Sequence, residues 1–406
     1  MPASRILLVT ALAISALAQN SPRIVDIKAA GGVTLKATYF PAAKPGPGAL
    51  LLHQVNRTRT SWADVAHRLA ASGIHTLALD LRGFGDSGGA PYLKANGKER
   101  TAIRRQRPSD IDAALEFLAS QPGVHRDVIG LAGAGYLGVA TSVDTAASHL
   151  PQIKSLVLIS GQVVLSGRQF LRRATQLPGL YVWADNDEYP PTAEVMEWMY
   201  GISTNPGKRF IHYSAAPAPW LGYEDDPISA TGSHGTDLFQ PHPELAAAIV
   251  DWFVTTLLKT PGHAPPHTNQ SAGSIPIPLL DEIEKPGGTA HATELLADAR
   301  RKNPKAQLWP WVVLNVMGYD NLQTGHTKLA LEIFKLNFTA YPDSADAASS
   351  LSDAYLAGGQ KELARQYAEK SLALLAADKM ETEARRKVIR ESAEQNLKQL
   401  ATKEGN

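Results

Sequence analysis

The stretch "LALDLRGFGDSGG", Leu77 to Gly89, predicts a buried strand that ends in a sharp reversal of the chain. It opens on apolar residues, and the four glycines that follow let the backbone turn with positive φ. Asp80 and Arg82 are expected to tie the two ends of this loop together. These residues have a structural role rather than a catalytic one, so the chemistry must lie elsewhere in the chain.

On either side of this stretch, from about Ile24 to Leu258, β-branched apolar runs alternate with amphipathic segments. This pattern is typical of a mostly parallel sheet covered by helices on both faces. No helix is expected between the first two strands, which predicts an antiparallel hairpin at the sheet edge. The predicted strands are residues 23–29, 33–40, 48–53, 74–80, 127–133, 154–160, 179–185 and 208–214. The helices are expected near residues 62–71, 110–120, 136–147, 191–200 and 243–258.

A second glycine-rich junction, "IGLAGAGYLG", covers residues 129–138. Its order of buried strand, tight turn and helix is the layout in which the motif GxSxG places a nucleophilic serine. The centre of that motif is Gly135 here. The junction therefore has the shape of a nucleophile turn without a nucleophilic side chain.

Three further loops follow predicted strands and carry residues suited to acyl-transfer chemistry. The strand "GALLLH" leads into "QVNRTRTSW", and the strand "GLYVWAD" leads into "NDEYPP", which contains Asp187. The loop "SATGSHGTDLF" places His234 between glycines, ahead of the last predicted helix of this region. Taken with Gly135, the chain order is nucleophile position, acid and histidine.

Residues 24–258 resemble the α/β-hydrolase superfamily, most of all its dienelactone hydrolase and serine aminopeptidase-like branch. The resemblance implies a doubly wound, mostly parallel sheet and descent from a hydrolase of esters, amides or lactones. It implies that Asp187 orients His234, the general base. It also implies an oxyanion hole formed by backbone N–H groups, from Tyr136 and from Gln54 or Val55.

Members of that branch have "GAS" where this chain has Gly133, Ala134 and Gly135. A covalent acyl intermediate needs a hydroxyl, thiol or carboxylate, and glycine supplies none. One hypothesis is a pseudoenzyme that binds a carbonyl-bearing ligand. A second is slow hydrolysis by water that His234 activates. A third is a nucleophile from another position, for which Ser160, at the end of the strand "KSLVLIS", is the nearest candidate.

The segment between Ser160 and Leu180 is too short for a large lid, which predicts an open cleft suited to a small ligand or a polymer end. The arginine-rich run "RTAIRRQRP", residues 100–108, follows the fourth predicted strand. This run is either a solvated surface or a border of the cleft, and in the second case it favours an anionic ligand.

Composition limits the remaining functions. The 406 residues include 40 basic and 39 acidic side chains, so a net charge of +1 gives no overall attraction to nucleic acid or to an anionic membrane. The chain has no cysteine, which excludes disulfides and thiolate chemistry. No metal motif, phosphate loop or nucleotide fingerprint is present, so no metal or other cofactor is implied.

The N-terminus, "MPASRILLVTALAISALAQN", has one arginine, an apolar run and a small-residue triplet. This pattern predicts a signal peptide over residues 1–18 and export to the periplasm or the outside of the cell. The alternatives are a retained anchor and a buried N-terminal helix.

The C-terminal part differs in composition and in its predicted secondary structure. We place the hydrolase-like domain at residues 22–259, an extended linker rich in proline and glycine at 260–289, and a helical domain at 290–406. Ala330 and Ala364 lie 34 residues apart, and the segments around them superpose at that offset. The region resembles a tetratricopeptide array, whose expected role is either interaction with a protein partner or packing against the rest of the chain. The alternative is an unrelated helical hairpin.

Overall fold

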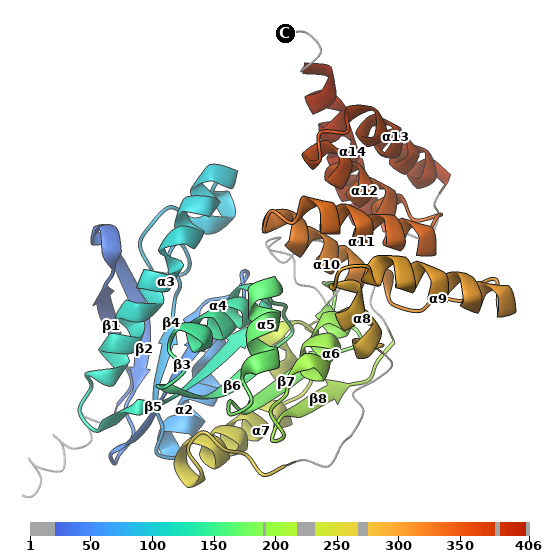
Figure 1. Ribbon diagram of the computed structural model, residues 1–406. Coiled ribbons are helices and arrows are strands. Elements are labelled where there is room, and N and C mark those ends of the chain that lie inside the picture. The colour runs from blue at the N-terminus through green and yellow to red at the C-terminus, as the bar shows by residue number, and fades with distance from the viewer. Residues whose placement is uncertain (1–20, 190–191, 217–231, 267–274, 378–381, 403–406) are drawn as a thin grey trace, which may run out of the picture. The chain divides into compact units, whose positions relative to one another are not determined.

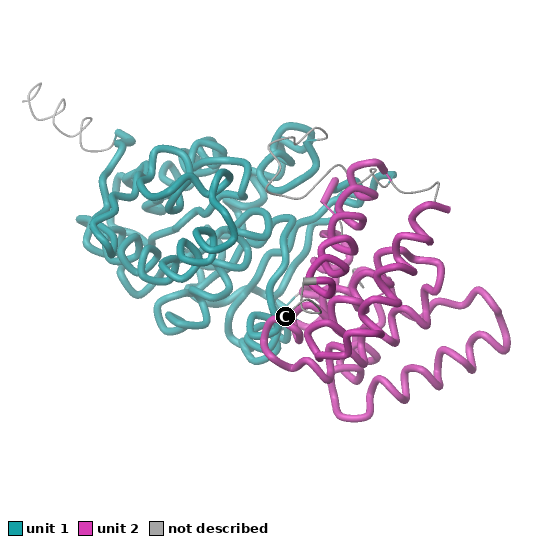
Figure 2. Tube along the Cα trace, turned by 90° about the horizontal axis from the view of Figure 1, so that it is seen from above, with its two compact units in different colours: residues 1–187, 203–216, 223–270 teal, residues 188–202, 217–222, 271–406 magenta. Residues whose placement is uncertain are grey.

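The computed structural model describes residues 21–189, 192–216, 232–266, 275–377 and 382–402. The chain divides into two compact units (Figure 2). The sheet unit comprises residues 1–187, 203–216 and 223–270, and the helical unit comprises residues 188–202, 217–222 and 271–406. The predicted signal peptide, residues 1–18, lies outside the described residues. Within the described residues, no helix is both long and apolar enough to cross a membrane.

In the described part of the sheet unit, eight strands form one sheet in the order β1-β2-β4-β3-β5-β6-β7-β8. The pairs β1–β2 and β2–β4 are antiparallel, and the other pairs are parallel. Every strand overlaps a predicted segment, although β5 extends beyond its segment at both ends, and the predicted edge hairpin is confirmed. The bounds are β1 Arg23–Lys28, β2 Thr34–Phe40, β3 Gly46–Leu52, β4 His75–Leu79, β5 Val124–Ala134, β6 Ile153–Ile159, β7 Gly179–Ala184 and β8 Arg209–Tyr213.

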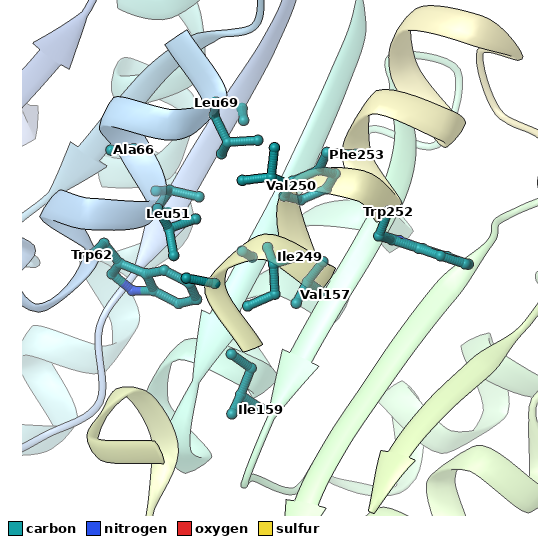
Figure 3. Close-up of a cluster of buried hydrophobic side chains, with 14 of the residues drawn as sticks. Leu51, Trp62, Ala66, Leu69, Val157, Ile159, Ile249, Val250, Trp252 and Phe253 are labelled. Carbon is teal, nitrogen blue, oxygen red and sulfur yellow. The ribbon is translucent and has the colours of Figure 1, made fainter. Parts of the chain in front are cut away.

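Helices cover both faces of this sheet (Figure 1). On one face lie α3 Gly97–Ala119, α4 Gly135–Ser148 and α5 Leu165–Arg173; on the other lie α2 Ala63–Ala71 and α7 Glu244–Phe253. A buried cluster joins α2 and α7 to the strands (Figure 3). It includes Leu51, Trp62, Leu69, Ile249 and Phe253. Removing these side chains from water is the main stabilising contribution, and it fixes α2 and α7 against the strands.

The helix α3 begins 13 residues before the segment we predict, at Gly97 instead of 110. Its start is fixed by a capping box, in which the Asn96 side chain accepts hydrogen bonds from the Lys98 and Glu99 N–H groups and the Glu99 carboxylate accepts from the Asn96 N–H. Pro108 lies inside the helix. The arginine-rich run is therefore helical, and its side chains are spaced around α3.

Asp80 ties the glycine-rich reversal after β4 together as expected, since its carboxylate accepts a hydrogen bond from the Asp86 N–H at 3.0 Å. Asp80 and Arg82 also each form a buried ion pair with a residue outside the loop. Asp80 accepts hydrogen bonds from the guanidinium and the backbone N–H of Arg59, the latter at 2.7 Å. Arg82 donates to the two carboxylate oxygens of Asp110 at 2.8 and 2.5 Å. At Gly85, with φ +51°, a Cβ would overlap the Asp80 carboxylate. Each charge in the loop is thus paired with a helix or turn outside it.

Two buried histidines in the sheet unit act as neutral hydrogen-bonding groups. His53 Nε2 accepts from the Leu81 N–H at 3.1 Å, while Nδ1 lies 2.7 Å from the Gln54 carbonyl oxygen and donates to it. His75 Nδ1 accepts from the Ala42 N–H at 3.2 Å. Burial lowers the pKa of both imidazoles below the usual value.

We expect the free energy of unfolding to decrease as the pH falls below about 6.5, the pKa of an unfolded histidine. Between that value and the lowered folded pKa of His53 or His75, the unfolded chain binds more protons, so acid favours unfolding. Each histidine contributes a slope of up to about 1.4 kcal/mol per pH unit. Urea unfolding at several pH values measures the slope. His53→Asn is expected to flatten the slope, and an unaltered slope in this variant would contradict the assignment.

The helical unit is built from helices that pack in succession. The pairs α10–α11 and α12–α13 are each joined by a short loop. One buried cluster is centred on Leu280, Trp309, Val313 and Ile333, and a second on Phe334, Leu351 and Tyr355. The bounds are α6 Thr192–Ile202, α8 Ile277–Ile283, α9 Gly288–Lys302, α10 Trp311–Gln323, α11 Thr327–Ala340, α12 Ala345–Ala357, α13 Lys361–Ala377 and α14 Glu383–Thr402.

The division into units differs from the predicted boundaries in two places. The helix α6 lies inside the range 22–259 but packs in the helical unit, where Trp198 and Ile202 join its buried cluster. Residues 277–283 form α8 inside the predicted linker, because Leu280 and Ile283 are spaced to bury one helix face. The helical unit therefore includes α6, which lies in the predicted hydrolase-like domain, and α8, which lies in the predicted linker.

Candidate active site

The junction between β5 and α4 has the backbone of a nucleophile turn. The chain passes from Ala134, with φ −118°, to Gly135, with φ +64°. A Cβ on Gly133 would overlap the backbone of Gly138, so the strand end and the first helical turn are in close contact. Gly135 thus occupies the left-handed conformation that this tight turn requires.

The predicted acid and histidine are brought together in the sheet unit. Asp187 follows β7 in a turn in which its N–H donates to the Ala184 carbonyl oxygen at 3.3 Å. His234 Nδ1 lies 3.0 Å from each Asp187 carboxylate oxygen, and both side chains are buried. The carboxylate accepts the Nδ1–H, so transfer of a proton to or from a substrate would pass through Nε2.

The histidine loop is fastened to the segment after β3 by side chains that the sequence analysis did not assign. Gln54 Oε1 accepts from the Thr236 N–H at 2.8 Å, and Gln54 Nε2 donates to the His234 carbonyl oxygen at 3.2 Å. Arg57 donates to both carboxylate oxygens of Asp237, each at 2.7 Å. These contacts fix the backbone on both sides of His234 and make Gln54 and Arg57 positioning residues.

The positions predicted for the oxyanion hole follow neighbouring strands. Leu52 at the end of β3 pairs with Gly133 near the end of β5 in parallel register. Gln54 and Val55 therefore leave the same sheet edge as Tyr136, because parallel strands end on one side of the sheet. Their role as donors to an oxyanion stays a prediction.

Ser160 has an unusual conformation beside Gly135. Its φ is +48°, and among the described residues it is the only non-glycine with positive φ. Ile159, at the end of β6, pairs with Ala134, and a Cβ on Gly161 would overlap the Gly135 carbonyl oxygen. The Ser160 Oγ is buried and has no hydrogen-bond partner among the described residues. The position of Ser160 at a strand end follows from the sequence, but its strained backbone does not.

Among the described residues, no group of three or more histidine and carboxylate side chains is arranged to hold a metal ion. The described site therefore consists of a buried acid–histidine pair, a turn without a side chain at Gly135, and a buried hydroxyl at Ser160. The acid–histidine pair can hold or move a proton. The turn at Gly135 supplies no side chain that could act as a nucleophile.

Comparison with known proteins gives a family match and several structural neighbours. A family model described as X-Pro dipeptidyl-peptidase (S15 family) matches residues 31–207. A dienelactone hydrolase from Anabaena variabilis is 17% identical, with 58% of this chain and 97% of that chain covered and a TM-score of 0.41. An esterase from Pyrococcus furiosus is 16% identical, with 59% of this chain and 92% of that chain covered and a TM-score of 0.44. A dienelactone hydrolase-like promiscuous phosphotriesterase from metagenomic libraries is 18% identical, with 57% of this chain and 98% of that chain covered and a TM-score of 0.42.

The family match includes Gly135 and Asp187 and ends before His234. It lies across β2 to β7, the central part of the sheet. The strand order adds an independent observation, since two antiparallel edge pairings precede a parallel core with crossover helices on both faces. The strand order and the helices on both faces match the α/β-hydrolase fold expected from the sequence.

Proposed function

We propose that this protein is an exported, hydrolase-derived binding protein whose sheet unit takes a carbonyl-bearing ligand without acyl-enzyme catalysis. The observation that carries the proposal is Gly135 at the nucleophile turn, with φ +64° and no side chain. A serine-type mechanism forms a bond between its nucleophile and the carbonyl carbon, and glycine has no atom to form it. The buried Asp187–His234 pair supports the proposal, since with Nδ1–H donated to Asp187 the Nε2 atom can accept a hydrogen bond from an N–H or O–H group of a carbonyl-bearing ligand.

The second part of the proposal concerns the helical unit, which we infer to be a tetratricopeptide-like array that binds a protein partner. Ala330 in α11 and Ala364 in α13 lie 34 residues apart, and both are fully buried. Small residues at this spacing let successive helices approach closely, as stacked repeats require. Signal-directed export through residues 1–18 completes the proposal.

A second candidate function is hydrolysis without a nucleophile at the turn. Water activated by His234 is one route, and the Ser160 hydroxyl is the other. The Ser160 route is favoured by one observation: a buried Oγ without a partner among the described residues, on a backbone with φ +48°. Strained conformations of this kind are concentrated at functional sites.

Hydrolysis of a short-chain p-nitrophenyl ester by the purified protein separates these functions. We expect the native protein to be no faster than His234→Ala, because no nucleophile is in place. Binding of a short-chain amide, which resists hydrolysis, is expected to shift the NMR resonances of the His234 ring. Native turnover lost in both His234→Ala and Ser160→Ala would contradict the binding proposal and establish a serine route. Turnover lost only in His234→Ala would establish the water route.

A further inference from the structure

The sheet unit contains a cavity away from the acid–histidine pair, between α3 and α4, which lie side by side in Figure 1. Its volume is about 120 Å³, which is room for a small ligand or several water molecules. The function proposed above does not use this space. Its polar lining includes Arg104, Arg107, Asp112, Thr141, Asp144 and Thr145.

Arg107 is the residue that makes this cavity unusual. It is only partly exposed, and within the described residues it makes no hydrogen bond and no ion pair. Burial lowers the pKa of its guanidinium, so the protein surroundings disfavour its charge. The buried arginines Arg59 and Arg82 differ, since each donates to carboxylate oxygens. A guanidinium carries five N–H donors in a planar fork, and Arg107 leaves this set available to the cavity.

The other lining groups indicate what the cavity can bind. Thr141 and Thr145 each donate their hydroxyl hydrogen to a carbonyl of α4 at 2.7 Å, so the donors toward a ligand come from the arginines. Asp112 is paired with His149 Nε2 at 2.9 Å. Asp144 makes no ion pair with Arg107, and burial raises the pKa of its carboxyl.

From this geometry we propose that the α3–α4 cavity binds a small oxyanion, a carboxylate or a phosphate, through the guanidinium of Arg107 with help from Arg104. A guanidinium binds carboxylates and phosphates through two parallel N–H···O hydrogen bonds in one plane. The cavity runs along α4, the helix that begins at Gly135. The site is separate from Asp187 and His234, so the inference stands whether or not the proposed function holds.

Titration of the full-length protein with inorganic phosphate and with succinate, at constant ionic strength, tests the proposal. We expect saturable binding of at least one probe, seen as NMR shifts or calorimetric heat. Arg107→Gln is expected to weaken it about tenfold or more, since the bidentate contact is lost. The matched control is Arg105→Gln, an exposed arginine on the same helix outside the cavity, with an expected change below about twofold. Phosphate alone would indicate a phosphoryl ligand, and succinate alone a carboxylate ligand.

One further variant and one further measurement keep the proposal falsifiable. Asp144→Asn is expected to tighten binding, because it removes a negative charge from the lining. Arg107→Gln is expected to keep or raise the melting temperature, since it relieves a buried charge that has no partner. No saturable binding, equal losses in Arg107→Gln and Arg105→Gln, weaker binding in Asp144→Asn, or a marked fall in the melting temperature of Arg107→Gln would each overturn it.

Discussion

Gly135→Ser is expected to create esterase activity, raising the rate with a short-chain p-nitrophenyl ester at least about 100-fold over the native protein. The turn already has φ +64°, and Asp187 lies 3.0 Å from His234 Nδ1 with both side chains buried. The substitution adds the one group that the site lacks, a hydroxyl on the turn after β5. A triad without its nucleophile loses most of its rate, so restoring that group has a large expected effect.

The matched control is Gly135→Ala, which adds a Cβ without a hydroxyl. Both variants place a non-glycine residue in the left-handed region, so each is expected to lose on the order of 1–3 kcal/mol of stability. Only Gly135→Ser should gain activity, and the gain should vanish in Gly135→Ser/His234→Ala. Steady-state kinetics and thermal unfolding of the native protein and the three variants measure the activity and the stability. A serine variant no faster than the alanine variant would mean that His234 is not aligned to activate a hydroxyl at this turn.

Asp80→Ala is expected to lower the free energy of unfolding by about 3–5 kcal/mol, the largest stability change that we predict. The carboxylate is fully buried and accepts hydrogen bonds from the Arg59 guanidinium, the Arg59 N–H and the Asp86 N–H. Its removal leaves the buried guanidinium of Arg59 without its inner counter-charge. It also leaves two backbone donors without their acceptor.

Asp86→Ala is the control for this change, because Asp86 also pairs with Arg59, at 2.8 Å. The Asp86 side chain is 68% exposed, so water replaces it at a cost below about 1 kcal/mol. Urea unfolding of the two variants measures the contrast. Equal losses of stability in both would contradict the view that the inner pair, Arg59 with Asp80, holds the loop.

The sequence predicted the strands of the sheet because each is a short apolar run bounded by glycine, proline or polar residues. It also predicted Asp187 and His234, since both follow strand ends in the expected chain order. The structure places these two residues in contact.

Other features depend on distant contacts that a local pattern does not encode. Gln54 and Thr236 are 182 residues apart, so nothing near Gln54 indicates that its side chain fixes the histidine loop. Ser160 has a positive φ next to Gly161, which packs against Gly135 at the end of another strand. The helix α6 has an ordinary amphipathic sequence, and only its partners Leu280 and Ile283 assign it to the helical unit. Sequence reasoning thus finds the chemistry-bearing residues better than the residues that position them.

Asp187 is also the last residue of the sheet unit before the chain enters the segment 188–202 of the helical unit. The carboxylate that orients His234 is therefore one peptide bond from a segment whose packing is decided elsewhere. Hydrogen bonds weaken steeply when their geometry departs from the optimum. A shift of the backbone at Asp187 would therefore change the hydrogen bond to His234 without any intervening side chain.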